Sequence, residues 1–197
     1  MDNDIKIKIF PYVNNYNNLK FDKEGLWSIS LPKDADKISR IIINEIGNNI
    51  ILDGMAGIGG NSISFCKYFN KVITIEMDTP RYKLLCNNIE QYNFTNISLL
   101  NTDVTNLFTN KIYIDLITNI CDGYFFDPQW GGRDYKKKKK LKLNICNNTL
   151  FNFIKLIRKY NKKKIIFKLP FNYDLTEFSK FNYKKYNIHN YNLIIIY

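Results

Sequence analysis

A glycine-rich segment is the first part of this sequence whose residue types could do chemistry. It runs from Asp53 to Asn61, after an apolar run and before a helical pattern, and contains Gly54, Gly57, Gly59 and Gly60. Glycines in such a loop let the backbone approach a ligand closely, where a Cβ would clash. The loop begins with a carboxylate, Asp53, which would repel a phosphate but suits the ammonium group of an amino acid.

Two more acidic residues follow later apolar runs. Glu76 lies about 20 residues beyond the loop, the distance at which an acidic side chain meets ribose hydroxyls in dinucleotide-type folds. Asp103 follows the run 97–100 and could accept a hydrogen bond from an adenine amino group. Together these carboxylates predict S-adenosylmethionine binding. The alternatives are a tight turn in an ordinary α/β protein and, for Asp103, a cap at the start of a loop.

The segment from Asp127 to Gly132, Asp-Pro-Gln-Trp-Gly-Gly, suits the other half of a methyl transfer. An exocyclic amine must be aimed at the methyl group, and the Asp127 side chain and the Pro128 carbonyl could accept its hydrogens. Trp130 offers a ring for stacking on a base, worth roughly 1–3 kcal/mol, and more if the base is cationic. The proton can leave after transfer, with Asp127 as a candidate acceptor. The alternative is a Pro-Gly turn with a Trp in the core.

Strands and helices alternate around these segments. Apolar runs predict strands at 50–52, 72–75, 97–100, 124–126 and 165–167, and alternation over 186–197 predicts a C-terminal hairpin. Helices are expected after Ser30, as a cap, up to Gly47, after Gly60, from Pro80 and over 150–160. This order predicts an α/β protein with a mostly parallel, Rossmann-like sheet and a C-terminal antiparallel hairpin.

The length and composition indicate one soluble domain. The chain has 197 residues, 45% of them hydrophobic and 24% charged, which is ordinary for a globular protein. We expect an N-terminal arm over 1–30 that contributes to the pocket and a single domain over 31–197. With no signal-peptide pattern and no apolar run of membrane-spanning length, a monomeric intracellular protein away from membranes is expected.

The remaining chemistry-bearing residues receive structural interpretations. The four cysteines form no CxxC pair, so they are expected to be reduced thiols, and no metal site is predicted. His189 is the single histidine and is expected to be structural.

Charge indicates the class of partner. Lys and Arg number 29 against 18 Asp and Glu, a net charge of +11, which favours nucleic acid. AT-rich coding would also produce this excess. The run Lys136–Lys140 could bind phosphates, or it could be a solvated loop.

The two motifs together resemble the trimethylguanosine synthase family of cap guanine-N2 RNA methyltransferases. Residues 53–61 match the family's Asp-x-x-x-Gly-x-Gly-Gly-Asn loop, and 128–132 match its Pro-Pro-Trp-Gly-Gly segment except at Gln129. Residues 24–32 are similar to the family's pre-core segment. The resemblance spans about Tyr16 to Pro170, and the compact chain resembles members from large DNA viruses.

The resemblance implies a role for each matching residue. Asp127, Pro128 and Trp130 would act on the acceptor, a 7-methylguanosine cap, with Ser28, Lys136 and Lys168 as further substrate contacts. Where the family has an Arg for the cap phosphates this chain has Phe171, so Lys168 or the lysine run would take that role. The cofactor contacts would be Ser30, Asp53, Gly54, Met55, Ala56, Gly57, Gly59, Asn61, Glu76, Met77, Asp103 and Val104.

The predicted activity is therefore methyl transfer from S-adenosylmethionine to the N2 amine of a capped RNA, in the nucleus or cytoplasm, or in the host cytoplasm or virion for a viral protein. Two alternatives stay open. One is another amino-methyltransferase acting on RNA or DNA bases. The other is a non-catalytic cap- or RNA-binding protein, for which Gln129 and Phe171 would be signs.

Overall fold

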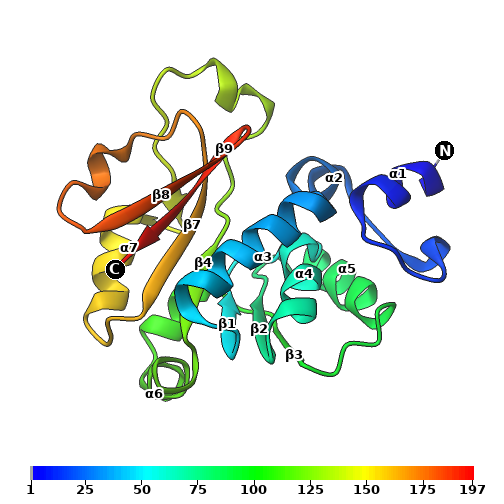
Figure 1. Cartoon of the computed structure of the whole chain (residues 1–197), viewed down its shortest axis with the longest axis horizontal. Helices are drawn as coiled ribbons and strands as arrows, with labels where there is room; N and C mark the ends of the chain where they lie inside the picture. The colour runs from blue at the N-terminus through cyan, green and yellow to red at the C-terminus, as the bar shows by residue number, and fades with distance from the viewer. Residues whose placement is uncertain (1) are drawn as a thin grey trace. The chain divides into compact units, whose positions relative to one another are not determined.

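The computed structural model describes residues 2–197, with every side chain in that range except that of Arg133. The chain divides into two compact units, Met1–Thr102 and Asp103–Tyr197. Each unit has its own strands and helices, labelled in Figure 1.

Three parallel strands form the centre of the first unit. They are β1 (Ile50–Asp53), β2 (Lys71–Ile75) and β3 (Ile97–Leu100), with β2 in the middle. Helix α4 (Gly60–Tyr68) connects β1 to β2, and α5 (Thr79–Glu90) connects β2 to β3. The register pairs Asp53 with Thr74, so β1 and β2 end together at one edge. The strands and helices expected for this region are confirmed.

Helix α3 (Pro32–Ile46) precedes the sheet and packs against α4 through buried polar contacts. The hydroxyls of Ser39 and Ser64 lie 2.7 Å apart. The helix begins at Pro32 and ends at Gly47, whose φ of 79° only glycine adopts easily. The expected cap by Ser30 is wrong: the N-cap residue is Leu31, without a side-chain hydrogen bond. Proline at the first position has no N–H, so one donor that a cap would serve is absent.

The N-terminal segment is more ordered than its sequence indicates. It contains α1 (Asp2–Ile9), the 3-10 turn η1 (Tyr16–Asn18) and α2 (Lys23–Ser28). Its buried side chains, among them Phe10 and Leu19, pack with Ile58 of the glycine loop and Leu85 of α5. The segment is therefore part of the core of the first unit.

The four longer strands of the second unit make one parallel and two antiparallel pairings. Strand β4 (Gly123–Phe126) pairs in parallel with β7 (Lys164–Pro170), and β7 pairs antiparallel with β9 (Tyr191–Ile196). Strands β8 (Tyr183–Ile188) and β9 form the expected C-terminal hairpin. His189 lies exposed in its turn with a φ of 45°, and its structural role stays a prediction.

The rest of the second unit covers these strands. It comprises the helices α6 (Lys111–Ile120) and α7 (Leu150–Arg158), a small hairpin of β5 (Asn144–Ile145) and β6 (Asn148–Thr149), and three 3-10 turns, η2 (Val104–Phe108), η3 (Arg133–Lys137) and η4 (Leu175–Phe178). Aromatic rings fill its core, where Phe153 meets both Phe108 and Phe126 edge-on. With its parallel strands, crossover helices and terminal hairpin, the expected α/β class is confirmed.

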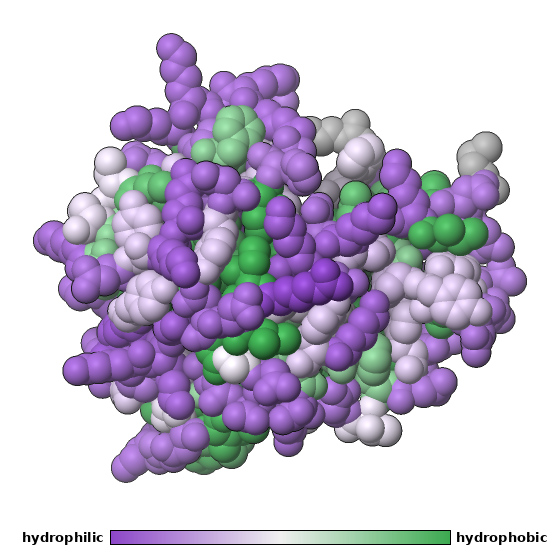
Figure 2. Space-filling view, viewed as in Figure 1, coloured by the Kyte–Doolittle hydropathy of each residue, from purple (hydrophilic) through white to green (hydrophobic). Residues whose placement is uncertain are grey.

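Several general expectations concern the whole described chain. The four cysteines are free thiols, with Cys66 and Cys121 buried. Within residues 2–197, no group of three or more acidic, Cys or His side chains is arranged to hold a metal ion. No helix in the described range is long and apolar enough to cross a bilayer. Hydrophilic side chains predominate on the face shown in Figure 2.

Candidate cofactor and acceptor sites

The glycine loop lies at the edge of the first unit where β1 ends and α4 begins. Gly57 and Gly59 have φ values of 59° and 109°, and a Cβ at Gly57 would meet open space. The Ala56 N–H donates to the carbonyl of Ile75, 2.9 Å away, at the end of β2. The loop therefore presents a glycine backbone at the edge where a nucleoside binds in this kind of fold.

Asp53 supports this loop through a buried hydrogen bond. Its side chain is fully buried, and the Ser62 hydroxyl donates to Oδ2 at 2.6 Å. This bond ties the end of β1 to the first turn of α4. The Asp53 carboxylate therefore stabilises the conformation of the glycine loop. Asn61, Gly54 and Ala56 are buried beside it, while Met55 and Gly57 are partly exposed.

Glu76 is held in place by backbone donors. Its Oε2 accepts from the N–H of Gly57 at 2.8 Å, and its Oε1 from the N–H of Asp78 at 2.9 Å. Burial raises the pKa of Glu76, although these two bonds oppose the shift. A carboxylate oxygen has two acceptor sites, so each oxygen can accept one more hydrogen. This geometry fits a ribose with two adjacent hydroxyls.

A residue that the sequence interpretation missed supports Glu76. Asn101 donates through Nδ2 to the carbonyls of Glu76 (2.8 Å) and Met77 (3.2 Å), and it accepts from the Thr79 hydroxyl. It thereby fixes the turn that carries Glu76 and the exposed Met77. Its position just after β3 was the available signal, since polar residues at strand ends surround ligands in such sheets.

The pre-core segment lies directly on the glycine loop. A Cβ on Gly60 would lie 2.6 Å from Cγ1 of Ile29 and 2.8 Å from the carbonyl oxygen of Ser30. Ser30 is buried, whereas Ser28 is exposed and donates to the Glu24 carbonyl at 3.0 Å. Ser30 is thus near the loop, and Ser28 faces solvent.

Two buried polar side chains of α5 hold this segment down. The amide of Asn88 donates to the carbonyls of Lys20 (2.8 Å) and Ile58 (3.0 Å) and accepts from the Lys20 N–H. Arg81 lies 2.8 Å from a Glu24 oxygen and 3.6 Å from one of Asp22. Nothing in the local sequence signals these contacts, because their partners are 30 or more residues away in the chain.

In the second unit, Asp103 both caps a turn and meets a thiol. It accepts from the N–H and hydroxyl of Thr105, each at 2.8 Å, and from Cys146 Sγ at 3.0 Å. Burial favours the neutral form of Asp103, but these hydrogen bonds outweigh it and lower its pKa. Burial and the Asp103 carboxylate raise the pKa of the Cys146 thiol to about 12. The capping alternative is thus present in the structure, with the predicted cofactor contact Val104 buried next to it.

The Asp-Pro-Gln-Trp segment follows β4 and forms a cluster with β7 and β9. The Lys168 ammonium lies 2.7 Å from Asp127 Oδ2. It also lies over the Trp130 ring at 5.1 Å and over the Tyr191 ring at 5.2 Å. We call Asp127, Trp130, Lys168 and Tyr191 the acceptor cluster. Tyr191 is a member that the sequence interpretation missed.

Trp130 contacts the Lys168 ammonium and two tyrosine rings. It is half-buried, with the Tyr135 ring edge-on at 5.1 Å and the Tyr191 ring at 6.4 Å. Its indole N–H is buried without a hydrogen-bond partner among the described residues, and such a donor is costly to leave unpaired. Pro128 is buried and Gln129 exposed.

Hydrogen bonds anchor the backbone of the lysine run, and its side chains are exposed to solvent. The amide of Asn172 donates to the carbonyls of Tyr135 (2.8 Å) and Lys138 (2.7 Å). Residues 136–140 are all exposed, and Lys137 pairs with Asp134 at 2.6 Å. The run is therefore a fixed loop with solvated ammonium groups. Phe171, where the resemblance implied an Arg, is half exposed.

Comparisons with known proteins agree with the class that this fold defines. A putative methyltransferase from Porphyromonas gingivalis has a TM-score of 0.63 at 16% identity, over 90% of this chain and 43% of its own. The Thermus thermophilus 16S rRNA N2 G1207 methyltransferase, solved with AdoMet and guanosine, has a TM-score of 0.60 at 13% identity, over the same shares. These likenesses concern the fold, which is that of Rossmann-like S-adenosylmethionine-dependent methyltransferases.

Sequence comparison identifies the family. The profile described as RNA cap guanine-N2 methyltransferase matches residues 48–193, so the chain belongs to this family of S-adenosylmethionine-dependent methyltransferases. Uncharacterized protein L320 of Acanthamoeba polyphaga mimivirus is 31% identical, over 98% of this chain and 85% of its own length. Trimethylguanosine synthase of Schizosaccharomyces pombe is 32% identical over 73% of this chain. This chain spans 62% of that yeast protein. The expected family resemblance, including that to a viral member, is confirmed.

Proposed function

We propose that this protein transfers a methyl group from S-adenosylmethionine to the exocyclic N2 amine of a 7-methylguanosine RNA cap. The observation that carries the proposal is the acceptor cluster, in which the Asp127 carboxylate, the Lys168 ammonium and two aromatic rings come together. Family membership over residues 48–193 supports the same reaction.

The first unit would hold the ribose and the amino-acid end of the cofactor, which supplies an electrophilic methyl group on sulfur. Glu76 would accept from the two ribose hydroxyls, since backbone donors already fix both of its oxygens. Gly57 would let the loop approach the amino-acid end, and Asp53 would keep that loop in place through Ser62. Asp103 would receive the adenine amino group through an oxygen not used by Thr105 and Cys146.

The acceptor cluster would orient the base. The Asp127 carboxylate and the Pro128 carbonyl would accept the two hydrogens of the N2 amine and aim its lone pair. Trp130 would stack on the guanine ring. Because Lys168 already pairs with Asp127 Oδ2, Asp127 would position the amine. The methyl–sulfur bond would break as the C–N bond forms, and the extra proton would then pass from nitrogen to water. The Lys136–Lys140 side chains would attract the phosphates.

One observation favours a second candidate, methylation of an amine on a base that carries no 7-methyl group. The Lys168 ammonium already occupies a cation position over Trp130 and Tyr191. A ring that has a cation on one face gains less from a second one, because like charges repel. A neutral guanine or adenine would then stack as well as a cationic base.

Transfer of tritium from labelled S-adenosylmethionine to capped RNA, followed by digestion to nucleosides, tests the proposal. The label should be found on N2 of the cap guanosine. Label on an internal base would favour the second candidate. Tight cap binding with no transfer would identify a binding protein and contradict the proposal.

A further inference from the structure

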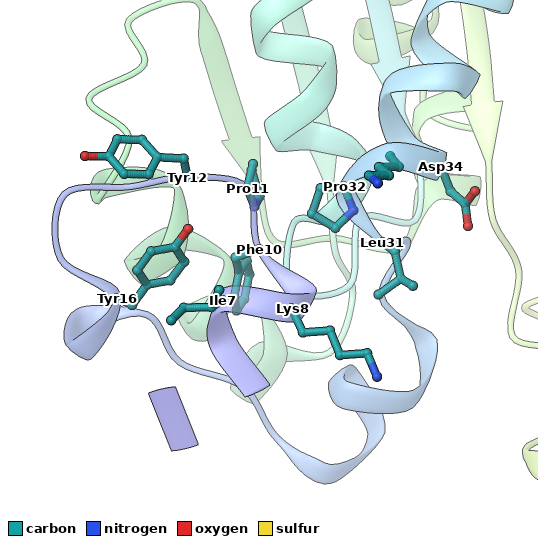
Figure 3. Close-up of a pocket in the computed structure, with 10 residues that line it drawn as sticks. Ile7, Lys8, Phe10, Pro11, Tyr12, Tyr16, Leu31, Pro32 and Asp34 are labelled. Atoms are coloured by element: carbon teal, nitrogen blue, oxygen red, sulfur yellow. The ribbon is translucent and has the colours of Figure 1, made fainter. Parts of the chain in front are cut away.

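A groove in the first unit has no part in the proposed methyl transfer. It lies between the end of α1, the chain that follows it and the start of α3, and has a volume of about 490 Å³. Pockets of about 300–1,000 Å³ hold small molecules the size of a nucleotide. Figure 3 shows its lining, with the Tyr12 and Tyr16 rings on one side of Pro11 and Lys8, Leu31 and Asp34 on the other.

Aromatic side chains give the groove stacking surfaces on a rigid base. Tyr12 is 80% exposed, whereas its neighbour Phe10 is 1% exposed and belongs to the core. Tyr16, half-buried, packs against that same core cluster. Every nucleobase has a face that can stack on an exposed aromatic ring such as that of Tyr12.

The charges of the groove suit a nucleotide. Lys8 and Lys33 are exposed at its lining, and Asp34, in the first turn of α3, is partly exposed. The two ammonium groups can neutralise a phosphodiester, and the carboxylate can accept from a base N–H or amino group. Rings, cations and one acceptor are the components of a single-stranded nucleic-acid site.

The groove adjoins the pre-core segment, which contacts the glycine loop. Leu31 and Pro32 line it, and the residues just before them, Ile29 and Ser30, contact Gly60 of the loop. A chain that reaches the reacting methyl group could therefore continue into the groove. The occupant is thus better explained as a further part of the substrate than as a separate ligand.

We propose that this groove binds a nucleotide of the single-stranded RNA downstream of the guanosine that is methylated. The inference rests on the proposed function and specifies the substrate as an RNA chain longer than the cap itself. The net charge of +11 favours RNA over a peptide as the occupant.

Direct binding of an uncapped oligouridine of about ten nucleotides, measured by fluorescence anisotropy without cofactor, tests the groove. Tyr12→Ala should weaken binding by at least roughly 5-fold, as expected for the loss of one stacked base. Tyr12→Phe keeps the ring and should bind like the unaltered protein. The matched control is Tyr113→Ala, which removes an exposed ring of α6 and should change nothing.

Equal oligouridine affinities of Tyr12→Ala and Tyr113→Ala, with both proteins folded by circular dichroism, would overturn the groove proposal. A second measurement keeps it separate from the proposed function. On a cap dinucleotide, too short to reach the groove, Tyr12→Ala should transfer methyl groups at the rate of the unaltered protein. Absence of transfer by the unaltered protein would contradict the proposed function and leave the groove result standing.

Discussion

At the scale of single residues, one ion pair, between Asp127 and Lys168, is central to the acceptor cluster. Asp127 and Lys168 are 12% and 7% exposed in their side chains, so water screens their attraction only weakly. The pair keeps the carboxylate where an amine could be received, and the same ammonium lies over two rings. Lys168 therefore controls both the charge and the stacking surface of the proposed base site.

Replacing Lys168 with Met tests this control. The substitution removes the cation over Trp130 and leaves the Asp127 carboxylate without its partner, so a cationic base should be attracted more strongly. We expect the ratio of methyl-transfer rates on 7-methylated and unmethylated caps to rise several-fold in this variant. Since both rates come from one protein preparation, a loss of stability cancels in the ratio. An unchanged or lower ratio would show that Lys168 does not compete with the base.

Glu76, as a proposed ribose contact, should make cofactor binding depend on pH. Burial raises its pKa, so its carboxyl group takes up a proton at a higher pH than an exposed glutamate does. The ionised form accepts from ribose hydroxyls, so affinity should be full at neutral pH and fall as the pH drops through this raised pKa. Calorimetry between about pH 7 and pH 4 measures the fall, which begins above the usual glutamate value of about 4.3.

The matched variant for this experiment is Glu76→Gln. It cannot titrate, and its amide has one oxygen where two backbone N–H groups need acceptors. It should bind weakly with no pH dependence over the same range. If the unaltered protein and Glu76→Gln show the same affinity and the same pH profile, Glu76 does not contact the ribose.

At the scale of elements, buried polar contacts add to apolar packing in fixing the N-terminal segment. Asn88 is fully buried and joins Lys20 to the loop carbonyl of Ile58. Asn88→Ala would leave these groups unsatisfied and should lower the free energy of unfolding by about 1–3 kcal/mol. Urea denaturation measures this loss. Since Ile58 is in the glycine loop, cofactor affinity should fall as well.

The control for Asn88 is Asn70→Ala in the same unit. The Asn70 side chain bonds only to Asn49, and both are exposed, so its removal should change stability by less than about 0.5 kcal/mol. Equal stabilities of the two variants would mean that the buried amide contributes little to holding the segment.

The Lys136–Lys140 run should make the affinity for capped RNA depend on salt concentration. Replacing Lys136 and Lys139 with Ser should flatten the plot of log affinity for capped RNA against log salt concentration, by about 0.7 for each lost phosphate contact. The same replacement at Lys184 and Lys185, both exposed on β8, removes equal charge elsewhere. If both double variants flatten the slope equally, only net charge matters and the loop has no specific role.

The strands and helices also show which parts of the fold can be predicted from the sequence. Buried apolar runs and helical spacing are local signals, and they predict β1 to β4, β7, the β8–β9 hairpin and the helices α3, α4, α5 and α7. The short strands β5 and β6 and the helices α2 and α6 are not predicted. Helix α1 was missed, since its alternating Ile and Lys do not show a helical period and packing of Ile9 and Phe10 stabilises it. The Asp127–Lys168 pair joins residues 41 positions apart, so no local pattern could predict it.

At the scale of the whole molecule, the two units divide the proposed work between them. The first contains the glycine loop, Glu76 and the groove. The second contains Asp103, the acceptor cluster and the lysine loop. The net charge of +11 steers a polyanionic substrate towards both. A substrate that carries a base, phosphates and a continuing chain therefore matches what the units offer separately.

The most direct test compares methyl transfer to three RNAs of one sequence, with a 7-methylated cap, an unmethylated cap and no cap. The account predicts fastest transfer to the 7-methylated cap, by up to roughly 30-fold over the unmethylated one if a full cation–π gain of about 2 kcal/mol is realised at Trp130. Trp130→Ala should abolish that preference while cofactor affinity stays unchanged. Equal rates on the first two RNAs would contradict the proposed recognition of a 7-methylguanosine cap.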